Sequence, residues 1–158
     1  LLPEIIKEFK HDNDVLFLIV GDGPERDNLE FQISNFKLKA ITQLVGVIPN
    51  YRVPYYISSA DVYLMPSEEE GMPNALLEAM AAGVPFVASR VASVPEITPP
   101  GVAEFVLPYG ETHLFAEKIK KLLADEELRK KISHEEQEWV RRYDASVIAP
   151  RYLALFRE

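Results

Sequence analysis

Apolar residues recur along the chain at two spacings, one typical of helices and one typical of strands. A helical stripe opens the chain and consists of Leu1, Leu2, Ile5, Ile6 and Phe9. Six consecutive apolar residues follow at 15–20, and glycines end this run at Gly21 and Gly23. A short apolar run of this kind indicates a parallel strand that is buried on both faces.

The same alternation continues through the middle of the chain. Further strands are expected at 41–47, 61–65, 85–89 and 104–107, and helices at 25–36, 53–60 and 74–82. Strands that alternate with helices at this spacing predict an α/β fold, a Rossmann-like parallel sheet with helices on both faces. The whole of 1–158 is expected to form a single domain.

From Thr112 onward the pattern is purely helical. The last predicted helix, over about 144–158, contains many apolar residues for a chain end: Ile148, Tyr152, Leu153, Leu155 and Phe156. Two interpretations stay open: the helix packs on this domain, or it docks on a partner domain.

Composition narrows the class of protein. The chain has 158 residues, of which 47% are hydrophobic and 27% charged, as in ordinary globular domains. Its net charge of −8 argues against a nucleic-acid partner, because such binding relies on Lys and Arg at phosphates. The absence of cysteine removes disulfides and thiolate chemistry, which fits a reducing compartment.

The most informative stretch is 65–85, which follows a predicted strand. It therefore lies at the carboxyl edge of the sheet, where open α/β folds bind ligands. Asn74 is the natural N-cap of the helix there, and Gly83 its end. The amides of Ala75, Leu76 and Leu77 would then lack partners inside the helix and could hold a phosphate.

Two carboxylates flank this helix start. Glu70 precedes the helix and Glu78 lies about one turn inside it. An ionised Glu only accepts hydrogen bonds, so each suits a pair of neighbouring hydroxyls on a sugar or a ribose. The alternative is a solvated acidic loop at 68–70 and a Glu78 favoured only by the helix dipole. The spacing alone leaves both interpretations open.

At these residues the sequence resembles the retaining glycosyltransferases of the GT-B architecture. This large family is glycosyltransferase family 4, also called glycosyl transferases group 1. Glu70 and Glu78 match that family's two glutamates, which are separated by seven residues. The match extends over nearly the whole chain, through the segments 20–25, 45–49, 61–67, 77–85 and 95–97. The resemblance implies transfer of a sugar, a hexose in particular, from a nucleoside diphosphate with retention of anomeric configuration.

The resemblance also implies roles for individual residues. Glu78 would hold the ribose hydroxyls, and Glu70, the catalytic residue, would hold the hydroxyls of the transferred sugar. Backbone amides of Asn74, Ala75 and Leu76 would bind phosphate and stabilise the departing nucleoside diphosphate. The other donor-binding positions that it implies are Gly21, Val45, Val47, Gly71, Met72 and Pro73. No cofactor and no obligatory metal are expected.

The chain departs from the family pattern in three ways. Members begin this domain with a strand and a Gly-Arg…Lys-Gly segment that neutralises the diphosphate, and an acceptor-binding N-terminal domain precedes it. This chain starts after both, so the fragment is expected to bind donor weakly and to transfer nothing. Ala92-Ser93 stands where many members have Gly-Gly or Gly-Ala, which puts a close contact of the backbone with the ligand in doubt. Pro73 replaces a common glycine and removes one N–H donor.

The partners expected from the resemblance are a nucleotide-sugar donor and the chain's own N-terminal acceptor domain, and no nucleic acid. The resemblance implies a cytoplasmic protein, with the inner face of the membrane as an alternative location reached through the absent half.

Other functions have weaker support. A nicotinamide dehydrogenase would need a third glycine where Arg26 stands, and an acidic residue at the end of the second strand. Asp-x-Asp is the metal-and-nucleotide signature of the other large glycosyltransferase architecture, and one occurs at 12–14. It precedes its strand, however, and so lies at the edge of the sheet opposite the ligand crevice. His11, His113 and His134 have no ligand-like spacing. Two alternatives remain: an epimerase or phosphorylase of the same architecture, and a nucleotide-binding domain without catalysis.

Overall fold

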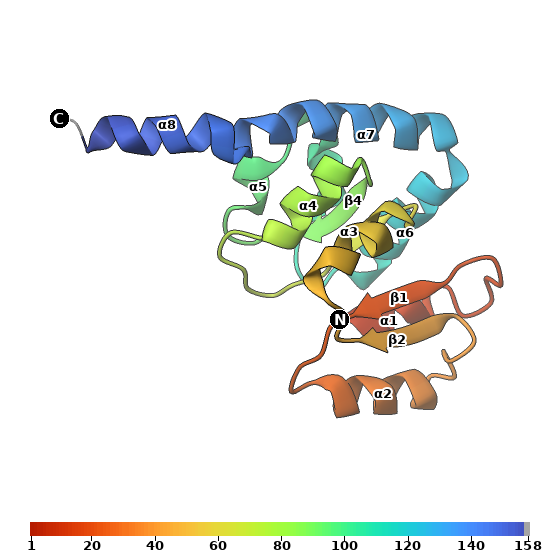
Figure 1. The fold of residues 1–158 in the computed structure, drawn as a ribbon. Coiled ribbons are helices and arrows are strands. Elements are labelled where there is room, and N and C mark those ends of the chain that lie inside the picture. The colour runs from red at the N-terminus through yellow and green to blue at the C-terminus, as the bar shows by residue number, and fades with distance from the viewer. Residues whose placement is uncertain (157–158) are drawn as a thin grey trace.

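The computed structural model describes residues 1–156, in which helices and strands alternate through the first two thirds of the chain (Figure 1). The strands are β1 (Phe17–Val20), β2 (Thr42–Gly46), β3 (Tyr63–Met65), β4 (Phe86–Ser89) and β5 (Val106–Leu107). The helices are α1 (Leu2–Lys7), α2 (Arg26–Asn35), α3 (Val53–Ser58), α4 (Asn74–Ala82), α5 (Val94–Ile97), α6 (Thr112–Ala124), α7 (Glu126–Val140) and α8 (Ala145–Leu155). Three short 3-10 turns are η1 (Asn50–Arg52), η2 (Pro100–Phe105) and η3 (Arg141–Tyr143). Every strand pair is parallel, so the predicted α/β class is confirmed.

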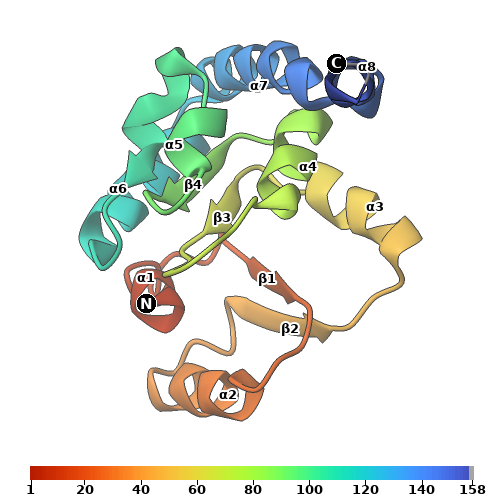
Figure 2. The same cartoon turned by 90° about the vertical axis from the view of Figure 1, so that its left-hand side faces the viewer.

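The strands form two groups with helices on either side. β1 pairs with β2, and β3, β4 and β5 form a second sheet in that order. Figure 2 shows α1, α2 and α6 along one side of the strands and α3 and α4 along the other. This arrangement is the expected one of helices on both faces, but the parallel sheet is divided between β1 and β3.

The division of the sheet changes the surroundings of β1. Phe17 and Ile19 pack against the core, whereas Leu16, Leu18 and Val20 keep exposed fractions of 57%, 42% and 40%. The prediction that this run is buried on both faces is therefore wrong. The exposed residues alternate with the packed ones, so one face of β1 is only partly covered among residues 1–156.

The second sheet holds most of the core. All four residues of β4 are buried, since α4 and α6 contact it from opposite sides. The last expected strand, at 104–107, is shorter than predicted: Glu104 and Phe105 belong to η2, and only Val106 and Leu107 pair with β4. Phe105 is fully buried, so its apolar character reflects burial and not strand structure.

The end of α4 is fixed by a glycine, as the sequence predicted. Gly83 has a φ of 73°, in the left-handed region, and the N–H of Val84 donates to the carbonyl of Ala79 at 3.0 Å. A Cβ on Gly83 would lie 2.7 Å from Gln137 Nε2 and 2.8 Å from Ser133 Oγ, both on α7. The glycine therefore allows both the chain reversal and the close packing of α7 on α4.

We expect Gly83→Ala to lower the free energy of unfolding by about 1–2 kcal/mol, because an L residue with a side chain is strained in the left-handed region. Urea unfolding followed by circular dichroism measures this loss. Gly23→Ala is the matched control, since Gly23 has ordinary backbone angles and open space around it. Equal stability of the two variants would contradict this role of Gly83.

The last helix stands apart from the rest of the molecule. Figure 1 shows α8 extending away from the body beyond the end of α7. None of its residues is buried, and Tyr152, Leu153, Leu155 and Phe156 have exposed fractions of 58–84%. The interpretation that this helix packs on its own domain is therefore wrong. Residues 157–158 of the expected helix lie outside the described part of the chain.

Candidate functional site

The loop between β3 and α4, residues 66–73, carries the predicted acidic residue of the site. It leaves the carboxyl end of β3, where ligands bind in open α/β folds. Glu70 is partly buried, and its Oε1 accepts a hydrogen bond of 2.7 Å from the hydroxyl of Ser67. The carboxylate thus has a fixed position. Ser67 and Glu70 are only three residues apart, so this hydrogen bond could have been expected from the sequence, but it was not predicted.

A second loop supports the first from the side. Ser93, which follows β4, donates its hydroxyl to the carbonyl of Gly71 at 2.8 Å and lies 3.8 Å from the sulfur of Met72. Its neighbour Ala92 has a φ of 42°, which glycine adopts at less cost. Ala92 therefore adopts the backbone conformation that a glycine would adopt at this position.

The loop after β5 is the third support. The hydroxyl of Tyr109 donates to Glu68 Oε2 at 3.3 Å. Loops from three adjacent strands are thereby joined at one edge of the sheet. The contacts of Ser93 and Tyr109 could not be predicted from local sequence, because their partners lie 22 and 41 residues away.

The start of α4 differs from the prediction in its hydrogen bonds. The N-cap is Pro73, not Asn74, and no side chain caps the helix. The N–H of Asn74 donates to the carbonyl of Met72 at 2.9 Å, and those of Leu76 and Leu77 donate to Pro73 at 3.0 and 3.2 Å. The expectation that Leu76 and Leu77 have unpaired amides is therefore wrong. The N-cap lies one residue earlier than predicted, so Pro73 provides the first accepting carbonyl.

One amide remains available at this helix start. Within the described residues, no hydrogen bond is formed by the N–H of Ala75, and Ala75 is exposed. An anion placed here would be favoured by the helix dipole by about 0.3–1 kcal/mol. The predicted phosphate site therefore consists of one free amide and the dipole, rather than three free amides.

Glu78 lies on the exposed side of α4, about one turn after its start. Both predicted carboxylates act on Tyr63 of β3: burial raises the pKa of its hydroxyl, and the negative charges of Glu70 and Glu78 raise it further. The hydroxyl stays protonated and can donate a hydrogen bond near the two carboxylates. Tyr63 was predicted only as a strand residue, so the influence of both glutamates on its hydroxyl is a result of the structure.

The remaining predicted positions come from the first sheet. Gly21 ends β1 with a φ of 120°, and its N–H donates to Gly46 at 2.8 Å. Gly21, Val47 and Ala75 line one cavity of about 700 Å³, which also runs between β1 and β3. Val45 lies within β2 and does not line it, and neither do Glu70 and Glu78. The structure thus places part of the predicted set around a shared cavity and the two glutamates beside it.

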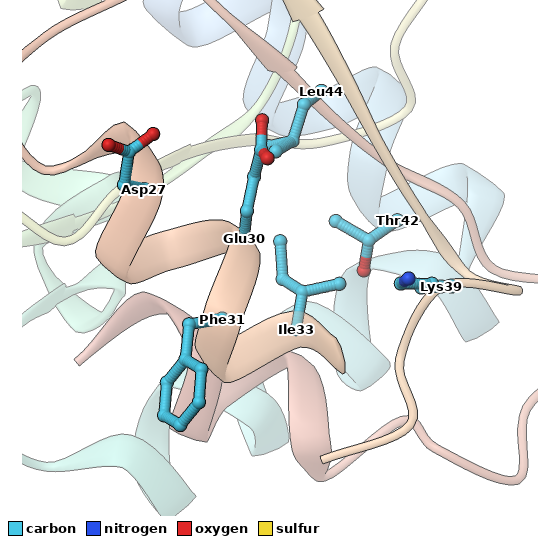
Figure 3. A pocket seen from close by; sticks show the side chains of 7 residues that line it. All are labelled: Asp27, Glu30, Phe31, Ile33, Lys39, Thr42 and Leu44. Carbon is cyan, nitrogen blue, oxygen red and sulfur yellow. The ribbon is translucent and has the colours of Figure 1, made fainter. Parts of the chain in front are cut away.

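A second hollow lies away from these loops, between α2 and β2 (Figure 3). Its volume is about 520 Å³, and its lining residues are Asp27, Glu30, Phe31, Ile33, Lys39, Thr42 and Leu44. Figure 3 shows the ring of Phe31 pointing away from Ile33 and Thr42. None of the predicted site residues lines this hollow, so we do not assign the chemistry to it.

Residues 1–156 contain neither a metal-binding cluster nor a membrane-spanning helix. No group of three or more His, Asp or Glu side chains there is arranged to hold a metal ion. None of the described helices combines the length and the apolar character that a membrane span requires.

Comparison with known proteins places this fold and its loops in a wider group. The family described as "Glycosyl transferases group 1" matches residues 1–139. The chain is 28% identical over 144 residues to 2-deoxystreptamine N-acetyl-D-glucosaminyltransferase of Niallia circulans, covering 90% of this chain and 37% of that protein. It is 33% identical over 127 residues to N-acetyl-alpha-D-glucosaminyl L-malate synthase of Bacillus anthracis, covering 80% and 33%.

A solved structure agrees in fold. A mutant of S. aureus TarM, in complex with fondaparinux, alpha-GlcNAc-glycerol and UDP, matches with a TM-score of 0.89 at 22% identity. The match covers 99% of this chain and 32% of TarM. At this identity the likeness concerns the fold alone. The chain spans about a third of the length of each of the three proteins.

Proposed function

Because the chain belongs to the family of group 1 glycosyl transferases, we propose that it is the nucleotide-sugar-binding domain of a retaining GT-B enzyme. The full-length enzyme would transfer a sugar, a hexose in particular, from a nucleoside diphosphate to an acceptor held by a separate N-terminal domain. The family match over residues 1–139 carries the transferase class. The UDP in the TarM complex makes a UDP-sugar the first donor to test.

The roles proposed for the two glutamates rest on the resemblance to the family, and their placement on either side of the start of α4 supports them. Glu70, held by Ser67 at 2.7 Å, would accept hydrogen bonds from hydroxyls of the transferred sugar. Glu78, exposed on α4, would accept them from the ribose. Hydrogen bonds to a charged group contribute about 1.5–3 kcal/mol each, which is enough to set the position of the donor.

The amide of Ala75 and the dipole of α4 would stabilise the charge that develops on the departing nucleoside diphosphate. No metal ion is part of this proposal. With one free amide, this contribution is small, so the domain alone would bind donor weakly. Additional cationic groups of the full-length protein would be needed for strong binding of the diphosphate.

The proposed donor site is tested by ligand-observed NMR on this chain with UDP, GDP, ADP and NAD. We expect one nucleoside diphosphate to bind and Glu78→Ala to weaken it at least tenfold, since about 1.4 kcal/mol corresponds to a factor of ten. Glu69→Ala is the matched control, because Glu69 is an exposed carboxylate of the loop that precedes α4. Unchanged affinity of a folded Glu78→Ala variant, or a preference for NAD, would refute the assignment.

The transfer reaction needs the full-length protein. Incubation with UDP-sugars and candidate acceptors should give a glycosylated product of unchanged anomeric configuration. Formation of a different nucleotide sugar without any acceptor would instead identify an epimerase. Transfer with inverted configuration would overturn the retaining mechanism while leaving the transferase class intact.

A further inference from the structure

The side of β2 that faces away from β1 is an open strand edge. The sheet to which β2 belongs contains only β1 and β2, so β2 has a strand neighbour on one side alone within residues 1–156. An unpaired edge presents free N–H and C=O groups and is a ready template for pairing with another chain. The surroundings of this edge show which chain fits it.

The register of the two strands identifies the free backbone groups. Phe17 of β1 lies opposite Thr42 of β2. The N–H of Phe17 donates to the carbonyl of Ile41 at 2.8 Å, so Phe17 directs its hydrogen bonds toward β2. In a parallel ladder, the residue opposite points its own N–H and C=O groups the other way. The backbone groups of Thr42, and those of Leu44 two residues later, therefore point to the open edge.

The hollow between α2 and β2 lies beside this edge (Figure 3). Thr42 and Leu44 line it from β2, and Phe31 and Ile33 line it from α2, whereas no residue of β1 or α1 does. The hollow therefore opens on the outer side of β2, away from β1. Phe31 is 69% exposed there. Apolar side chains and free backbone groups are thus available on the same side of the molecule.

Charged side chains lie at the two ends of the hollow. α2 follows β1, so it begins at the carboxyl edge of the sheet, where Asp27 and Glu30 lie in its first two turns. Lys39 precedes β2 and lies at the amino edge, and Figure 3 shows it at the opposite end of the lining from Asp27. Glu30 pairs with Arg26 at 3.0 Å, whereas Asp27 and Lys39 form no ion pair within residues 1–156. The hollow is thus acidic at one end, apolar in the middle and basic at the other.

A surface with this arrangement is complementary to a second copy of itself. A two-fold axis that pairs β2 with β2 of the other copy makes the two strands antiparallel. The amino edge of each copy then lies against the carboxyl edge of the other, so Lys39 of each copy faces Asp27 and Glu30 of the other. Every contact occurs twice, as in all isologous interfaces.

The register of that strand pair follows from the free groups. In antiparallel strands, two residues whose N–H and C=O groups face each other exchange two hydrogen bonds. An axis at Gln43 places Thr42 of each copy opposite Leu44 of the other, which gives two such pairs. The Gln43 side chains are exposed in this chain and lie opposite each other at the axis, where their amides can form hydrogen bonds. The two small sheets thereby join into one continuous sheet.

We propose that the open edge of β2 and the hollow beside it form the contact between two copies of this chain, related by a two-fold axis at Gln43. The contact is independent of the proposed donor site, because no residue assigned to that site lines the hollow. Stable protein–protein interfaces bury about 800 Å² per partner. A short strand and one side of a helix bury less, so the dimer is expected to form at roughly 0.1–1 mM protein.

Exchange of charges across the contact tests the proposal, by sedimentation equilibrium of this chain from about 20 μM to about 1 mM. We expect a monomer–dimer equilibrium that Lys39→Glu weakens at least about tenfold, because like charges then face each other. Adding Asp27→Lys to Lys39→Glu should restore the affinity to within about threefold, because opposite charges face each other again. A chain that stays monomeric at about 1 mM would overturn the proposal, and so would a double variant no tighter than Lys39→Glu.

Lys131→Glu is the matched control for these substitutions. Lys131 is exposed on α7, which lies on the opposite side of the molecule from α2 (Figure 1). The substitution changes the net charge by the same amount as Lys39→Glu and should leave the affinity unchanged. Equal weakening by the two would show that net charge governs the association and would overturn the proposal. Circular dichroism of each variant checks that it is folded.

Hydrogen exchange of single amides locates the contact. We expect Thr42 and Leu44 to exchange at least about threefold more slowly at about 1 mM than at about 20 μM, because their amides are paired in the dimer. Gln43 and Val45 are the internal controls, since their amides face β1 and should not respond to concentration. Leu18 reports on the free side of β1, which is the competing edge. Slower exchange of Leu18 at high concentration, with Thr42 unchanged, would place the contact there and overturn the proposal.

Discussion

Glu136→Gln is expected to stabilise this chain by about 4 kcal/mol at pH 7.5. Glu136 of α7 is completely buried, and its only hydrogen bond among the described residues is a long one, 3.5 Å from the N–H of Phe86 to Oε1. Burial raises the pKa of Glu136 from its ordinary value of 4.5 to about 9; the hydrogen bond from Phe86 lowers this pKa, and the negative charge of nearby Glu135 raises it. The folded protein therefore holds a proton on this carboxyl that the unfolded chain has released.

The sign of the pH dependence follows from this proton. A pKa that is raised on folding contributes stability that is complete below pH 4.5 and is lost progressively as the pH rises to about 9. Between 4.5 and 7.5 the loss is about 1.4 kcal/mol per unit, which gives about 4 kcal/mol. A glutamine has the same shape and keeps an acceptor for Phe86, but it has no proton to lose.

Urea unfolding at pH 5 and pH 8 measures this difference. We expect the gain from Glu136→Gln to be small at pH 5 and several kcal/mol larger at pH 8. Glu138→Gln is the matched control on the same helix, because Glu138 is exposed and pairs with Arg141 at the surface. Parallel pH profiles of the wild-type protein and Glu136→Gln would show that Glu136 is ionised in the folded state.

Glu70→Ala is expected to lower kcat/KM of the full-length protein by about 10²–10⁴. The estimate assumes that two hydrogen bonds to a charged group are lost, each of about 1.5–3 kcal/mol, with about 1.4 kcal/mol per factor of ten. Ser67→Ala should have a smaller effect in the same direction, because it removes the 2.7 Å bond that positions Glu70 but leaves the carboxylate.

The matched control is Glu69→Ala, which removes an exposed carboxylate from the same loop and should change kcat/KM by no more than about twofold. Initial rates of sugar transfer with a saturating acceptor measure all three variants. A Glu70→Ala enzyme as active as Glu69→Ala would contradict a role for Glu70 at the donor sugar. Circular dichroism of each variant separates loss of function from loss of folding.

The order and type of the elements could be predicted from periodicity because each helix or strand buries its own apolar stripe. The helix at 74–82 was predicted with the bounds that the structure has, since Pro73 restricts the backbone at the helix start and Gly83 permits the left-handed conformation that ends it. The strand at 104–107 was predicted too long, because the same apolar residues can be buried in a 3-10 turn. Local sequence predicts more reliably that a residue is buried than which backbone conformation it adopts.

In the candidate site, too, local features were predicted and long-range contacts were not. The sequence located Glu70 and Glu78 around a helix start, because their spacing is a local property. The hydrogen bonds of that helix start were predicted incorrectly, since they depend on the turn at Met72 and Pro73, which forms only in the folded structure. Ser93, Tyr63 and Tyr109 belong to other segments and are brought to this edge by the sheet.

The sequence by itself determined the α/β class, the position of the acidic loop and the likeness to a glycosyltransferase family, because these depend on local periodicity and on motifs read in order. The tertiary structure alone decided which amides are free, which loops touch, and that one face of β1 is only partly covered. The physical reason is that burial and hydrogen bonding depend on neighbours distant in sequence. An apolar run such as 15–20 indicates that its residues are suited to a core, but its neighbours decide whether a core is there.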